Sequence, residues 1–123
     1  MVNRLLVTVI DDDESVRESL PDLLKEFGFA AKAFSSAEEF HASGFVEKTD
    51  CLILDIAMPG MTGPELMREL ARNRKEVPII FITAQKDEVV RSQLLAQGAV
   101  ECLFKPFSDT VLLAALKAAL KLA

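Results

Sequence analysis

The 123-residue sequence contains no tryptophan, no tyrosine, a single histidine and only two cysteines. Both cysteines, Cys51 and Cys102, lie inside apolar runs, which indicates buried thiols in a reducing cytoplasm. No cysteines and histidines are clustered with the spacing of metal ligands. This composition excludes a metal site built from thiolates and imidazoles.

The sequence also lacks a long apolar stretch and an excess of positive charge. No run approaches the ~20 apolar residues of a membrane span, and the first residues lack the apolar core and cleavage site of a signal peptide. The net charge of -5 argues against broad nucleic-acid binding through phosphate contacts. Because half of the residues are hydrophobic, we expect one folded domain over residues 1–123, located in the cytoplasm without membrane association.

Apolar runs and amphipathic segments alternate along the whole chain. The predicted strands are residues 5–10, 30–34, 51–55, 78–83 and 100–104, and the predicted helices are residues 15–27, 37–42, 63–73, 87–97 and 108–122. Five strand–helix units in this length predict an α/β fold, with a doubly wound parallel sheet and helices on both faces. The strand runs are continuously apolar, as strands buried on both faces must be.

Capping residues and one proline help to predict the bounds of the first and last helices. Ser15 and Glu18 have the spacing of a capping box and predict that the first helix begins at Ser15. Pro21 removes a helical hydrogen bond, but the apolar period runs through it, so we expect one uninterrupted helix. Ser108 is a favourable N-cap for the last helix.

Polar residues stand where four of the apolar runs end. Asp11 and Asp12 follow the first run, Asp55 ends the third, Thr83 ends the fourth and Lys105 follows the fifth. If the runs are parallel strands, these residues lie on one rim of the sheet, where open α/β sheets place their ligand sites. Carboxylates, a hydroxyl and one ammonium together describe a site for a divalent cation beside a phosphoryl group.

Each of these residues also has a simpler interpretation. Residues 11–13 alone would suggest a solvated turn before a helix, and Lys105 alone would suggest a surface lysine. The combination with further polar strand ends favours a site. We assign Asp13 and Glu14 to the helix N-terminus, where acidic residues are favourable. His41 is expected to be exposed and to have no catalytic role.

The four polar strand ends and their neighbours form a set of motifs at characteristic spacing. They are Asp11-Asp12, Asp55 with Met58-Pro59-Gly60-Met61-Thr62-Gly63, Thr83-Ala84, and Lys105-Pro106-Phe107. This set resembles the receiver domain of two-component response regulators over essentially the whole chain. Residues 10–17 most resemble receivers that precede helix-turn-helix output domains. The resemblance implies a flavodoxin-like (βα)5 fold with strand order 2-1-3-4-5.

The resemblance also implies a magnesium site. Asp12 and Asp55 would bind Mg²⁺ directly, Asp11 through water, and Ala57 through its main-chain carbonyl. Mg²⁺ prefers octahedral oxygen ligands and keeps several waters, so one or two carboxylates suffice.

The catalytic residues implied by the resemblance are Asp55, Thr83 and Lys105. Asp55 would accept the phosphoryl group as an acyl phosphate. Lys105 would place positive charge beside one phosphoryl oxygen and Thr83 would donate a hydroxyl hydrogen bond to another. The family pattern also implies a cis peptide bond before Pro106.

Two positions depart from the family pattern. Receivers usually carry an aromatic residue three positions before the lysine, and this chain has Cys102 there. We therefore expect switching without an aromatic rotamer change. Ala57, two positions after Asp55, offers no side-chain hydrogen bond to an attacking water or to the phosphoryl group. In the order 2-1-3-4-5, the strands carrying Cys51 and Cys102 lie two spacings apart, roughly 9–10 Å, which is too far for a disulfide.

We interpret the sequence as a phosphorylation-activated switch in transcription regulation. It would take its phosphoryl group from a sensor histidine kinase and catalyse its own modification with Mg²⁺, without an ordinary turnover substrate. We expect it to signal through the face built by residues 87–97, 100–104 and 108–122, as a homodimer, and not to bind nucleic acid itself. The chain is either a single-domain regulator or a receiver from a longer protein.

Three alternatives belong to other functional classes. A pseudo-receiver would act only as a protein-binding module, but it would normally have lost an acidic residue or the lysine. A small phosphatase with an aspartate nucleophile would usually carry a second aspartate where Ala57 stands. A flavin- or nucleotide-binding module is disfavoured because no glycine-rich loop follows the first strand.

Overall fold

The computed structural model describes residues 4–122, so residues 1–3 and 123 of the predicted domain lie outside the described part. The strands are β1 (Leu6–Ile10), β2 (Ala30–Phe34), β3 (Cys51–Asp55), β4 (Ile79–Thr83) and β5 (Glu101–Phe104). The helices are α1 (Glu14–Glu26), α2 (Ala37–Ala42), α3 (Gly63–Arg72), α4 (Glu88–Ala96) and α5 (Asp109–Leu120). All strand pairs are parallel and the order is β2-β1-β3-β4-β5, which confirms the predicted fold.

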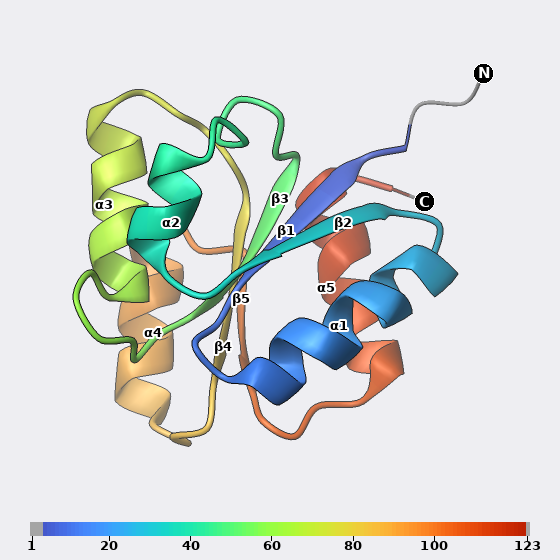
Figure 1. The fold of residues 1–123 in the computed structure, drawn as a ribbon. Coiled ribbons are helices and arrows are strands. Elements are labelled where there is room, and N and C mark those ends of the chain that lie inside the picture. Colours follow the sequence, from blue (N-terminus) through green and yellow to red (C-terminus); the bar gives the residue numbers. More distant parts are fainter. Residues whose placement is uncertain (1–3, 123) are drawn as a thin grey trace.

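The sheet lies between two layers of helices. Helices α1 and α5 cover one face, and α2, α3 and α4 cover the other (Figure 1). Successive side chains of a strand point to opposite faces, so Val9 and Ile53 pack under α1 and α5 while Ile10 and Leu54 pack under the other layer. Every residue of β3 and β4 is buried, which explains their unbroken apolar runs.

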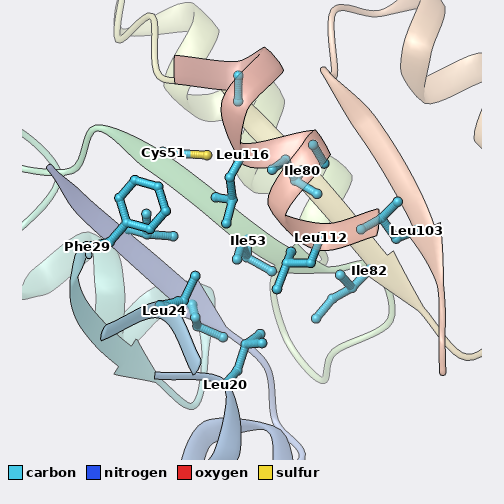
Figure 2. Packing of buried hydrophobic residues seen from close by; sticks show 14 residues of the cluster. Leu20, Leu24, Phe29, Cys51, Ile53, Ile80, Ile82, Leu103, Leu112 and Leu116 are labelled. Carbon is cyan, nitrogen blue, oxygen red and sulfur yellow. The ribbon is translucent and has the colours of Figure 1, made fainter. Parts of the chain in front are cut away.

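The core under α1 and α5 is built mainly from branched aliphatic side chains. Figure 2 shows Leu20 and Leu24 of α1 facing Leu112 and Leu116 of α5 above the strands. Cys51 belongs to this cluster, whereas Cys102 belongs to the cluster on the opposite face, and both are buried free thiols as predicted. The sheet itself therefore separates the two cysteines.

The start of α1 corrects the capping-box prediction. The N-cap is Asp13, whose carboxylate accepts hydrogen bonds from the main-chain N–H of Ser15 at 2.9 Å and from its hydroxyl at 2.8 Å. The helix therefore begins at Glu14, and Ser15 lies in its first turn instead of capping it. Asp13 caps the helix in place of Ser15 because its backbone is extended and its short carboxylate reaches the free N–H of Ser15 in the first turn. The helix runs through Pro21 without interruption, as predicted.

The remaining boundaries agree with the prediction to within two residues. Ser108 is the N-cap of α5 and accepts from Val111 N–H at 3.1 Å. Thr62 and Glu65 form a capping box at the start of α3, which holds the end of the loop after β3.

His41 is exposed, as expected. Within residues 4–122, no helix has the length and apolar character needed to cross a membrane.

Candidate functional site

The carboxyl ends of four strands meet at one rim of the sheet, as the sequence predicted. Asp11 follows β1 directly, Asp55 and Thr83 are the last residues of β3 and β4, and Lys105 follows β5. The parallel register pairs Asp55 with Ile82, so Thr83 extends one residue further along the rim. The position of each residue at the end of its strand therefore places it at this rim.

Three carboxylates form an acidic cluster at this rim. One oxygen from each of Asp11, Asp12 and Asp55 lies within 4.8 Å of the others. Asp11 is completely buried and Asp55 is only 7% exposed, whereas Asp12 is exposed. Burial and the nearby charge of Asp11 raise the pKa of Asp55 to about 7, while Lys105 opposes the rise. The cluster therefore favours a bound cation.

The ammonium group of Lys105 lies among these carboxylates. Its Nζ lies 2.8 Å from Asp11 Oδ2 and 3.9 Å from Asp55 Oδ1. The main-chain N–H of Lys105 donates to the Thr83 carbonyl at 2.8 Å, which anchors the loop after β5. The Lys105–Pro106 peptide bond is cis, as the family pattern implied. One ammonium against three carboxylates leaves negative charge for a further cation to offset.

The loop after β1 is held by contacts that the sequence did not predict. The N–H of Asp13 donates to Asp11 Oδ1 at 2.9 Å, which orients the buried carboxylate. Arg17 Nη1 donates to the Asp11 carbonyl at 3.0 Å. Arg17 stands six residues further along the chain, at the end of the first turn of α1, and its residue type alone does not signal this role. The first bond orients the carboxylate of Asp11, and the second anchors its main chain.

Thr83 and Ala57 lie at the site without direct bonds to the carboxylates. The buried Thr83 hydroxyl accepts from the Gln85 N–H at 3.1 Å. Ala57 is exposed in the loop after Asp55. Among residues 4–122, no hydrogen bond joins either residue to Asp11 or Asp55. The structure thus gathers the acidic residues and Lys105 directly, and places the other two at the margin.

The loop after β3 is closed by a glycine and tied to α2. A Cβ at Gly63 would lie 2.2 Å from the Asp55 carbonyl oxygen, so no other residue fits this close approach without a shift. Glu38 of α2 accepts from the Met61 N–H at 2.9 Å. The sequence placed Gly63 in a motif but did not reveal that its hydrogen faces the main chain of Asp55. Both contacts hold the segment that carries Ala57.

The donor set identifies the kind of ion that fits the site. The ligands offered are carboxylate oxygens, and there is no thiolate or imidazole among them. Hard divalent cations such as Mg²⁺ prefer such ligands. With Lys105 beside the same oxygens, the arrangement can hold a cation and a phosphoryl group together.

The chain is similar to known proteins over nearly all of its length. Residues 7–117 match the family model for the response regulator receiver domain. Nodulation protein W of Bradyrhizobium diazoefficiens is 41% identical over 94% of the chain and 51% of its own length. Transcriptional regulatory protein FixJ of Azorhizobium caulinodans is 38% identical over 98% of the chain and 57% of its own length. The chain thus spans about half the length of these curated relatives.

Solved structures agree with the sequence relatives. The structure of the response regulator StyR superposes with a TM-score of 0.88 and 40% sequence identity, and the match covers 97% of this chain and 60% of that one.

Proposed function

The chain belongs to the response regulator receiver family, and we propose that it accepts a phosphoryl group on Asp55 and thereby switches a signalling surface. The observation that carries this proposal is the position of Asp55 at the sheet rim, within 4.8 Å of two further carboxylates and 3.9 Å from Lys105 Nζ. The receiver family is not an enzyme family. We infer that this member catalyses only its own phosphorylation and dephosphorylation.

Phosphoryl transfer to Asp55 is a displacement at phosphorus. A carboxylate oxygen of Asp55 forms the new bond while the bond to the histidine nitrogen of a kinase breaks, and the departing imidazole nitrogen takes up a proton from solvent. Lys105 neutralises charge that develops on the phosphoryl oxygens. Because the pKa of Asp55 is raised to about 7, its reactive anion is disfavoured until positive charge enters the cluster.

The Mg²⁺ ligands that we propose are Asp11, Asp12, Asp55 and the Ala57 carbonyl. When bound, Mg²⁺ supplies positive charge that offsets the repulsion between the carboxylates and an incoming phosphoryl group. Asp11 is held by the Asp13 N–H and by Lys105, so its carboxylate has little freedom to turn. Asp12 is exposed and free to reach the cation from the solvent side.

Thr83 connects the site to the rest of the molecule. Its hydroxyl lies at the end of the strand next to Asp55 and is suited to donate to a phosphoryl oxygen. Movement of Thr83 towards that oxygen would strain its contact with the Gln85 N–H and displace residues 84–87, which lead into α4. We infer that this segment carries the signal outwards.

The partners that we infer are a sensor histidine kinase and a second copy of the chain. The face of α4, β5 and α5 exposes Val89 (66%) and Val111 (47%), large apolar side chains that a dimer would cover. One relative is named a transcriptional regulatory protein, and the chain spans about half of such relatives. We therefore propose that the switch controls transcription through a further part of the protein.

Small phosphodonors test the proposal without a kinase. We expect the protein incubated with acetyl phosphate and Mg²⁺ to gain the mass of one phosphoryl group, and to gain none when EDTA replaces Mg²⁺. Intact mass spectrometry measures both arms. A protein that stays unmodified with Mg²⁺ would instead favour the binding module without phosphoryl chemistry.

A further inference from the structure

Helix α4 is held to the sheet by few buried side chains. Leu94 is its only buried residue among those described, and Val90 is partly buried against the same core cluster. By contrast, α5 buries four residues and α3 also buries four. A helix with so small a buried face depends on polar contacts for its position.

Arg91 supplies such contacts to β5. Its Nε donates to the Cys102 carbonyl at 3.1 Å, and its Nη2 lies 2.7 Å from Glu101 Oε1. The same Glu101 oxygen accepts from the Cys102 N–H at 2.9 Å. Because β5 is an edge strand, its outer main-chain groups have no further strand to pair with. The Arg91–Glu101 pair therefore satisfies both main-chain groups of Cys102 and joins them to α4.

The position of Arg91 in the chain makes this contact sensitive to the phosphorylation site. Only residues 84–87 lie between Thr83 and the first residue of α4, and Arg91 stands in the first turn of that helix. Cys102 is fixed by its pairing with Phe81 of β4. A shift of the segment after Thr83 therefore moves Arg91 relative to a strand that stays in place.

We propose that Arg91 and Glu101 form a latch that holds α4 against β5, and that occupation of the Asp55 site opens it. This inference rests on the proposed function of Asp55. Hydrogen bonds between charged groups are stronger than neutral ones, but both side chains are 32% exposed, so solvent weakens the pair. A contact of such intermediate strength suits a switch, because a ligand must be able to overcome it.

Thermodynamic linkage determines whether removing the latch strengthens or weakens binding at the Asp55 site. If a phosphoryl group at Asp55 opens the latch, removing the latch must make the phosphoryl state easier to reach by the same factor. A residue that only stabilises the fold would have the opposite effect or none when it is replaced. The latch therefore predicts a gain of affinity on mutation.

The experiment measures binding of beryllofluoride, an analogue of the phosphoryl group, in saturating Mg²⁺ by isothermal titration calorimetry. We expect Arg91→Gln and Glu101→Gln each to tighten binding on the order of three- to tenfold. The effect of the double variant should be smaller than the product of the two single effects, since both substitutions remove the Arg91–Glu101 ion pair. Arg72→Gln is the matched control, because Arg72 pairs with Glu69 on the exposed side of α3, and its affinity should equal that of the wild type.

Unchanged or weaker binding by both single variants would overturn the latch while leaving the role of Asp55 intact. A wild-type protein that does not bind beryllofluoride would overturn the proposed function and the latch together. Hydrogen exchange provides a second readout without ligand. Amides of α4 should exchange faster in Arg91→Gln than in the wild type while those of α3 are unchanged, and equal exchange in α4 would also overturn the latch.

Discussion

At the scale of single residues, the site is defined by three carboxylates whose oxygens lie within 4.8 Å of one another. Asp11 and Asp55 are buried, yet both are acidic and both lie beside Asp12. Lys105 compensates for only part of this charge. This crowding lowers the stability of the metal-free fold, and a cation bound among the carboxylates would offset the repulsion.

Removing Asp12 should remove the response to Mg²⁺. If Mg²⁺ binds the folded site and not the unfolded chain, Mg²⁺ at 100 times its Kd should stabilise the wild type by about 2.7 kcal/mol. Asp12→Ala should abolish most of this gain and raise the metal-free melting temperature, because one repelling charge is lost. Thermal unfolding with Mg²⁺ and with EDTA measures both effects. Asp22→Ala, an exposed position in α1, is the control, and an Asp12→Ala protein that responds like it would refute the ligand role.

The raised pKa of Asp55 predicts a pH dependence of stability. Its pKa is about 7 in the folded protein against 3.8 for the free side chain, so between these values the folded state binds more protons than the unfolded one. Without Mg²⁺, the free energy of unfolding should therefore fall from pH 4 towards pH 7, on the order of a few kcal/mol for this group. Denaturant titrations across this range measure it. Asp55→Asn should flatten the fall, and an equally steep fall in that variant would assign it to other groups.

At the scale of secondary structure, the strands were predictable and the contacts between elements were not. Continuous apolar runs ending in Asp55 or Thr83 placed the site residues on one rim, because parallel strands share the direction of their ends. The bonds from Arg17 to Asp11 and from Arg91 to Cys102 join residues whose types and spacing carry no motif. They depend on how helices pack on the sheet, which the local sequence does not encode.

The N-cap of α1 differs from the residue that the capping-box pattern predicted. Ser15 was expected to cap the helix, but Asp13 occupies that position and accepts two hydrogen bonds from Ser15. Asp13→Ala should therefore lower the melting temperature on the order of several degrees. Ser15→Ala should cost less, because the Ser15 N–H can still donate to Asp13. Thermal unfolding of both variants measures the ranking, and the reverse order would restore Ser15 as the cap.

At the scale of the whole molecule, a small change at one rim must reach a distant surface. The face of α4, β5 and α5 carries exposed apolar side chains, and Thr83 leads into α4 through four residues. Cys102 is small and buried, so its rotamer offers little energy difference between two arrangements. We therefore expect coupling to run mainly through Thr83, residues 84–87 and α4.

This route predicts different effects for two substitutions on dimer formation. Thr83→Ala should still be phosphorylated but should show a smaller rise in molecular mass on phosphorylation. Cys102→Ala should keep both phosphorylation and the rise. Size-exclusion chromatography with light scattering, with and without phosphodonor, measures the mass. The opposite ranking would make Cys102 part of the coupling, and a wild type that stays monomeric in both conditions would leave the output with another protein.

The central claim is that Asp55 is the sole phosphoryl acceptor, and the most direct test is the intact mass of its variant after phosphodonor and Mg²⁺. The wild type and Asp22→Asn should each gain one phosphoryl group. Asp55→Asn should gain none, because the amide cannot form the acyl phosphate although the acidic residues around it remain. A phosphoryl gain that persists in Asp55→Asn would contradict the account.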